Sequence, residues 1–124
     1  MINFRHLLKS FSYAWAGIVY AFHRDQNLRV HVLIAFLVII ASIYFKVNAF
    51  EMGILGVMIL LVMVAEMLNT AIEKMVDLIT TEHRENAKIA KDVASGMVLL
   101  TAVGSIVVGI LVFYPHISRL FMHR

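Results

Sequence analysis

The chain has 124 residues, of which 61% are hydrophobic and 15% are charged, and its formal net charge is +3. Soluble domains contain about 45–50% apolar residues, so this composition indicates a protein that uses lipid as its solvent. The sequence has no cysteine, which excludes disulfides, thiolate metal sites and a cysteine nucleophile. Basic residues at the ends of membrane helices account for the positive charge, and we do not expect nucleic-acid binding.

The first segment, residues 1–27, has the spacing of an amphipathic helix. Apolar side chains recur every three or four positions between Phe4 and Phe22, which is the helical period. Arg5 and Lys9 lie off this apolar stripe. Such a helix is suited to the membrane surface. A secretory signal peptide is the competing interpretation, but the basic residues here flank one face and do not precede a continuous apolar block.

Three apolar runs follow, and each predicts a membrane-spanning helix. Their ranges are 28–47, 50–77 and 86–115. The second run carries charged residues near its end, so we expect that helix to continue beyond the bilayer into the cytoplasm. The third run is uncharged from Val93 to Tyr114, which is long enough to span the hydrocarbon core, and we expect Pro115 to end it. The whole chain, 1–124, is predicted to form a single all-α membrane domain.

Lysine and arginine are divided unevenly between the two predicted membrane sides. Eight of the 11 lie in the N-terminal segment or near the connection 74–92, and three lie on the other side. Cytoplasmic loops are enriched in these residues. The N terminus and the 74–92 connection are therefore predicted to be cytoplasmic.

The most informative pattern lies late in the second apolar run, where four polar residues recur at helical spacing: Glu66, Asn69, Glu73 and Asp77. At about 100° per residue they share one helix face. Burying a polar group without a partner is unfavourable, so four aligned groups favour a functional site over simple helix association. Glu66 is expected at the depth of a lipid hydroxyl, where a carboxylate can accept a proton. Asp77 can equally be a solvated residue or an ion-pair partner of Lys74.

A second polar cluster marks the start of the third apolar run: Lys88, Lys91, Asp92 and Ser95. Lysine beside carboxylates is suited to phosphate and to a phosphate-bound Mg²⁺, whereas the simpler interpretation is snorkelling of lysine at the membrane boundary. The sequence contains no P-loop and no protein-kinase motif, so a nucleotide site would have to be built from helices. The six histidines form no His-x-x-x-His pair, and we expect them to make interfacial hydrogen bonds.

These two segments resemble the prokaryotic diacylglycerol kinase family, which includes the undecaprenol kinases. The resemblance rests on 65–77 and 90–96 and extends from about Tyr13 to Leu100. It implies an all-α integral membrane fold with an N-terminal amphipathic surface helix, three transmembrane helices and a homotrimeric assembly with active sites between protomers. It further implies a multi-pass lipid kinase of the bacterial plasma (inner) membrane, with ATP and Mg²⁺ as cofactors, a membrane lipid as substrate and a cytoplasmic active site.

The same resemblance implies roles for individual residues. Glu66 resembles the catalytic base, and Asn69 and Ser95 resemble contacts to the lipid substrate. Asp25 and Glu73 resemble the carboxylates that hold the metal on ATP. The implied nucleotide contacts, besides those two carboxylates, are Tyr13, Asp77, Glu82, His83, Arg84, Lys91 and Asp92.

Two positions depart from the family pattern. Asp25 stands where the family usually has Glu, and His6 aligns with an Arg of proteobacterial members. The stretch Asp25–His31 resembles the acidic-x-Asn-x-Arg-Ile-His signature of undecaprenol kinases, so we expect undecaprenol as the lipid and diacylglycerol as the alternative. A non-enzyme alternative is an oligomeric cation pathway lined by acidic rings, although a pore would not need the Lys91–Asp92 pair on the same membrane side.

Overall fold

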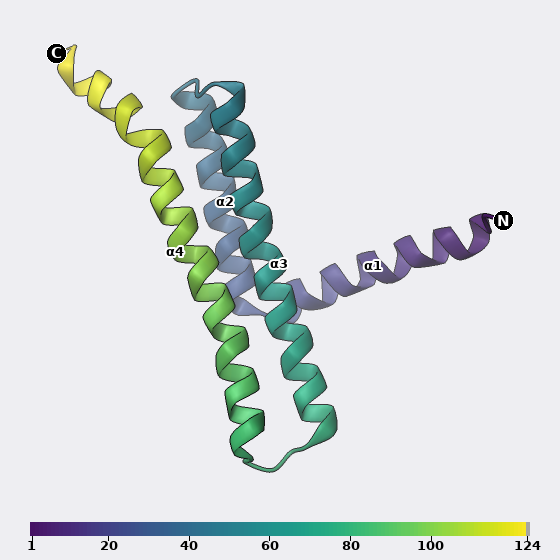
Figure 1. Ribbon diagram of the computed structural model, residues 1–124. Coiled ribbons are helices and arrows are strands. Elements are labelled where there is room, and N and C mark those ends of the chain that lie inside the picture. Colours follow the sequence, from purple (N-terminus) through teal and green to yellow (C-terminus); the bar gives the residue numbers. More distant parts are fainter. Residues whose placement is uncertain (124) are drawn as a thin grey trace.

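The computed structural model describes residues 1–123, and all of their regular structure is helical, which confirms the all-α class. The helices are α1 (Phe4–Arg24), α2 (Gln26–Tyr44), α3 (Ala49–Ile79) and α4 (Glu85–Met122). The last three lie side by side as a bundle, whereas α1 projects away from it (Figure 1). Because α3 contacts each of the other three helices, it is the element on which the fold is assembled.

Three of the four helices are long and apolar enough to cross a membrane. α2, α3 and α4 have 19, 31 and 38 residues, with apolar windows of mean hydropathy 2.0, 2.1 and 2.5. The hydrocarbon core requires about 20 residues of helix. Large apolar side chains such as Leu37 and Leu100 are exposed on the outside of the bundle, as expected where lipid replaces water. The prediction of three helices able to span the membrane is confirmed.

The end of α4 differs from the prediction. Pro115 lies inside this helix, which continues to Met122, so the prediction that the proline ends the helix is wrong. Proline removes one backbone donor and crowds the preceding turn, but membrane helices tolerate it because neighbouring groups can satisfy the freed backbone atoms. The last turns of α4 point away from α2 and α3 (Figure 1).

Asp25 separates α1 from α2 and stabilises the ends of both helices. Its backbone N–H donates the last hydrogen bond of α1, and its Oδ1 accepts from the backbone N–H of Asn27 at 2.9 Å as the N-cap of α2. Arg29 reaches back from α2, and its Nη1 donates to the carbonyls of Phe22 and His23 at 3.0 and 2.8 Å. Helix-end groups that would otherwise lack partners are thereby satisfied, which defines the direction in which α1 leaves the bundle.

The connection between α2 and α3 is a tight turn with defined caps on both sides. The N–H of Val47 donates to the carbonyl of Ser42 at 3.2 Å, which closes the end of α2 in the manner of a Schellman motif. Lys46 within this turn has a φ of 53°, in the left-handed region that favours glycine. On the other side, Asn48 and Glu51 form a reciprocal capping box that begins α3.

Replacing Lys46 by glycine should stabilise the protein. A left-handed backbone costs about 1–2 kcal/mol for a residue with a Cβ atom, and glycine avoids this cost. We expect Lys46→Gly to raise the midpoint of thermal unfolding in detergent. Lys46→Ala is the matched control, since it removes the same charge but keeps the Cβ atom. An equal rise in both variants would show that the charge, and not the backbone, is responsible.

Candidate active site

Glu66 lies in a cluster of polar side chains where α2 meets α3. It is 1% exposed, and neither of its carboxyl oxygens has a hydrogen-bond partner within residues 1–123. The carboxylates of Asp25 and Glu73 are near enough to interact with it electrostatically. A buried polar group without a partner is rare in folded proteins, and one common reason for keeping it is a catalytic role. Glu66 is therefore the strongest single indication of chemistry in this chain.

His31 lies on α2 directly opposite Glu66. Its Nε2 is 3.3 Å from Oε1 of Glu66, although the geometry is not that of a hydrogen bond. We had expected His31 to make an interfacial hydrogen bond, and the structure instead places it against the buried carboxyl. No local pattern reveals this contact, because the two residues belong to different helices.

Thr70 connects Asp25 to α3. Its side chain is nearly buried, at 7% exposure, and its hydroxyl donates to Oδ2 of Asp25 at 3.5 Å. Since Oδ1 of Asp25 caps α2, both oxygens are oriented, yet each carboxylate oxygen keeps a further lone pair for a cation. Thr70 is not among the residues predicted from the sequence, although its spacing of four residues from Glu66 indicates that the two share a helix face.

Asn69 and Glu73 continue the polar face along α3 toward the α3–α4 connection. The side-chain amide of Asn69 donates to Oε1 of Glu73 at 3.4 Å. The Oδ1 atom of Asn69 is buried and has no partner in the described part of the chain, whereas Glu73 is exposed. The structure therefore brings Glu66, Asn69 and Glu73 together with Asp25 in one acidic cluster.

A pocket of about 610 Å³ lies at the α3–α4 connection. Exposed ion pairs line it: Nζ of Lys91 on α4 is 2.9 Å from Oδ1 of Asp77 on α3, and Nζ of Lys88 is 2.6 Å from Oδ2 of Asp92 within α4. The ion-pair partner of Asp77 is thus Lys91 on the facing helix and not Lys74. Most residues expected to contact the nucleotide line this pocket: Asp77, Glu82, His83, Arg84, Lys91 and Asp92.

Two of the residues expected to contact the nucleotide or the lipid belong neither to the acidic cluster nor to the pocket at the α3–α4 connection. Tyr13 is 72% exposed on α1, and Ser95 is exposed on α4. In the described residues neither side chain hydrogen-bonds to the acidic cluster. Their roles stay predictions.

The acidic cluster fits a nucleotide-bound cation better than a metal held by the protein alone. Residues 1–123 contain no group of three or more His, Asp or Glu side chains arranged to hold a metal ion. Mg²⁺ in phosphate-transfer sites commonly takes one or two carboxylates and completes its shell with phosphate oxygens and water. Asp25 and Glu73 supply a donor set of this kind.

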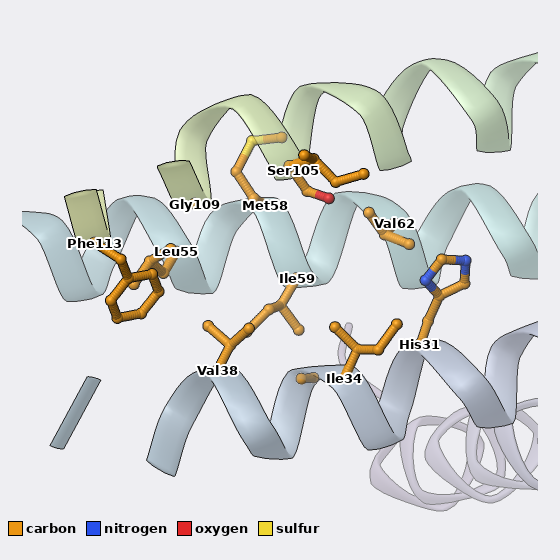
Figure 2. A pocket seen from close by; sticks show the side chains of 12 residues that line it. His31, Ile34, Val38, Leu55, Met58, Ile59, Val62, Ser105, Gly109 and Phe113 are labelled. Atoms are coloured by element: carbon orange, nitrogen blue, oxygen red, sulfur yellow. The ribbon is translucent and has the colours of Figure 1, made fainter. Parts of the chain in front are cut away.

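An apolar pocket of about 210 Å³ lies between α2, α3 and α4. His31 lies at one end of it and Phe113 at the other (Figure 2). Its walls are almost entirely aliphatic, with residues such as Ile34, Val38, Leu55, Ile59 and Val62. Because His31 also contacts Glu66, the pocket leads to the acidic cluster.

Residues 12–113 match the family model described as prokaryotic diacylglycerol kinase. The chain belongs to the prokaryotic diacylglycerol kinase family. It is therefore a membrane-bound lipid kinase, which takes a phosphoryl group from a nucleotide and transfers it to a lipid. The resemblance recognised in the polar segments is confirmed.

Known relatives of this lipid kinase carry two different names. The diacylglycerol kinase of Synechocystis sp. is 42% identical over 118 residues, which are 94% of this chain and 67% of that protein. The undecaprenol kinase of Bacillus subtilis is 39% identical over 107 residues, which are 86% of this chain and 87% of that protein. The diacylglycerol kinase of Escherichia coli is 28% identical over 114 residues, which are 92% of this chain and 93% of that protein. The family is therefore established, while the relatives differ in the lipid that they are named for.

Proposed function

We propose that this kinase transfers the γ-phosphoryl group of Mg²⁺-bound ATP to the hydroxyl of undecaprenol, giving undecaprenyl phosphate and ADP. The observation that carries the proposal is the buried carboxyl of Glu66, which lacks hydrogen-bond partners in the described residues and lies between the acidic cluster and His31 at the end of the apolar pocket. A lipid chain in the pocket would bring its hydroxyl to the end where His31 lies. The geometry thus suits a reaction between a membrane alcohol and a phosphate held by charged groups.

Glu66 is assigned the role of general base. In the transfer, the lipid oxygen forms a bond to the γ-phosphorus, the bond between that phosphorus and the oxygen of ADP breaks, and the hydroxyl proton passes to the Glu66 carboxylate. A positioned base contributes about 10²- to 10⁴-fold to such a reaction. Asn69 and Ser95 are assigned to the lipid near its hydroxyl, and the unpaired Oδ1 of Asn69 is an acceptor suited to this contact.

Asp25 and Glu73 are assigned to the metal, and the pocket at the α3–α4 connection to the nucleotide. Held by these two carboxylates, Mg²⁺ on ATP would neutralise charge on the phosphates during transfer. The Lys91–Asp77 and Lys88–Asp92 pairs are exposed, and exposed pairs contribute only about 0–1 kcal/mol. A nucleotide phosphate can therefore replace Asp77 as the partner of Lys91 at little cost. Tyr13 and the loop residues Glu82, His83 and Arg84 complete the proposed nucleotide contacts.

The assembly we propose is a homotrimer in which all 124 residues form one membrane kinase domain. Two observations support it. Tyr13 and Ser95 are exposed in the single chain, and α1 carries apolar side chains such as Phe11 and Trp15 that are 68% and 67% exposed there. We place α1 as an amphipathic helix on the cytoplasmic surface of the bacterial plasma membrane, because the basic residues favour that side.

The choice of undecaprenol rests on the stretch Asp25–His31, which resembles that of undecaprenol kinases, and on the apolar walls of the pocket. The names of the relatives do not decide between the lipids, since one at 42% identity is named for diacylglycerol and one at 39% for undecaprenol. Diacylglycerol, with phosphatidic acid as product, is the alternative.

The direct test is to incubate the purified protein in detergent with γ-labelled ATP and a panel of lipids, and to resolve the products. Labelled undecaprenyl phosphate supports the proposal, and label in phosphatidic acid alone supports the alternative. Label in neither lipid would contradict both assignments.

The metal assignment predicts an altered Mg²⁺ requirement. Glu73→Gln and Asp25→Asn each remove one anionic ligand while keeping the side-chain size, and asparagine remains a good N-cap for α2. We expect the Mg²⁺ concentration for half-maximal activity to rise about 10-fold or more in each variant, by comparison with other metal-site substitutions. Glu51→Gln is the matched control, because Glu51 lies at the far end of α3 and contacts His116 there. Unchanged Mg²⁺ dependence in both test variants would mean that ATP and water alone hold the cation.

A further inference from the structure

His31 lies against both the apolar pocket and the buried carboxyl of Glu66. It lines the apolar pocket at one end (Figure 2), and its Nε2 is 3.3 Å from Oε1 of Glu66. Its side chain is 22% exposed, whereas that of Glu66 is 1% exposed. His31 therefore stands between the space assigned to the lipid chain and the group assigned to the proton.

The surroundings of Glu66 explain why a donor is needed at this point. The other ionisable groups that act on it are the carboxylates of Asp25 and Glu73, and like charges repel one another. Among the residues that the structure describes, His31 is the one basic side chain in contact with Glu66. The terminal torsion of glutamate has broad preferences, so a donor to one oxygen would fix the direction of the Glu66 carboxylate, which has no hydrogen-bond partner in the described residues.

We infer that His31 is a positioning residue, whose Nε2–H holds Oε1 of Glu66 and leaves Oε2 for the lipid hydroxyl. The inference rests on the proposed role of Glu66 as the base. The present contact has the right length but lacks hydrogen-bond geometry, and hydrogen bonds of this kind commonly tighten only when substrate is bound. His31 acts through Glu66 and does not itself take the proton.

A pair of amide substitutions tests this inference. The glutamine amide nitrogen can reach the place of Nε2 and donate to Glu66, whereas the asparagine amide is one methylene shorter and cannot reach it. We expect His31→Asn to lower kcat about 10- to 100-fold, as for a misplaced reacting group, with the KM for ATP unchanged. His31→Gln should retain most of the activity. Ser42→Ala is the control, since Ser42 lies on the same helix as His31 but outside the pocket lining, and its hydroxyl bonds within that helix, to the carbonyl of Val38 at 2.7 Å.

Equal losses in His31→Gln and His31→Asn would overturn the inference, because the shape of the ring and not its donor would then matter. A loss in Ser42→Ala as large as that in His31→Asn would also overturn it, since loss of any polar side chain from α2 would then have the same effect. Full activity in both His31 variants has the same consequence. Thermal unfolding of each variant shows whether a loss of kcat reflects loss of fold. Failure of the base assignment is separate: it would appear as turnover that survives substitution of Glu66 itself.

Discussion

Glu66→Gln should reduce phosphoryl transfer by about 10²- to 10⁴-fold, which is the contribution of a positioned base. Glutamine keeps the size of the side chain but cannot accept the proton. We expect insertion and assembly to remain intact, because the substitution removes a buried carboxylate from beside Asp25 and Glu73 and so removes repulsion. The measurement is kcat with labelled ATP at saturating lipid, together with the midpoint of thermal unfolding.

Glu73→Gln provides the matched comparison on the same helix face. High Mg²⁺ should restore activity to Glu73→Gln, whose defect lies in metal binding, but not to Glu66→Gln, whose defect lies in proton transfer. If Glu66→Gln turns over at nearly the normal rate, Glu66 is not the base. If Mg²⁺ restores both variants, Glu66 belongs with the metal ligands instead.

Undecaprenol should be phosphorylated more efficiently than diacylglycerol when both are present at equal surface concentration in the same mixed micelles. The apolar pocket has only two polar side chains in its lining, His31 and Ser105, and Ser105 bonds to its own helix. It offers little to recognise the esters of a glyceride. An apolar site distinguishes similar chains by about 1–3 kcal/mol, so we expect a preference of about 10- to 200-fold in kcat/KM.

The two outcomes of this comparison have different consequences. A ratio of kcat/KM that favours diacylglycerol would overturn the substrate assignment and leave the kinase assignment unchanged.

A bulky substitution in the pocket, Gly109→Leu, tests where the lipid chain binds. It should lower kcat/KM for undecaprenol and change the KM for ATP less, because Gly109 lines the apolar pocket. An effect confined to ATP would show that the lipid chain binds elsewhere.

The sequence predicted those parts of the structure that depend on local patterns. The three spanning helices follow from apolar runs, and the shared face of Glu66, Asn69 and Glu73 follows from the helical period. The turn at Lys46 could not be predicted, because lysine has no preference for the left-handed region that it adopts there. The continuation of α4 past Pro115 likewise departs from the usual rule for proline, which membrane helices tolerate where neighbouring groups satisfy the freed backbone atoms.

The contacts that complete the candidate site were beyond prediction for another reason. Thr70 and Asp25 are 45 residues apart, and His31 reaches Glu66 from a different helix. Lys91 and Asp77 meet across the connection between α3 and α4. Such pairs depend on how the helices rotate and slide against one another, which periodicity within a single helix does not determine. His31 is an example: from the sequence we expected it to form an interfacial hydrogen bond, whereas in the structure it lies against Glu66.

The junction at Asp25 constrains how this protein can vary in length. One residue inserted between Asp25 and α2 would turn the acidic side chain by about 100° around the helix axis, away from the hydroxyl of Thr70 that it now meets. The same insertion would displace Arg29 from the last carbonyls of α1. Insertions and deletions at this point should therefore disrupt the site through packing, whereas the connection at 80–84, which has no buried residue, is constrained by its proposed nucleotide contacts instead.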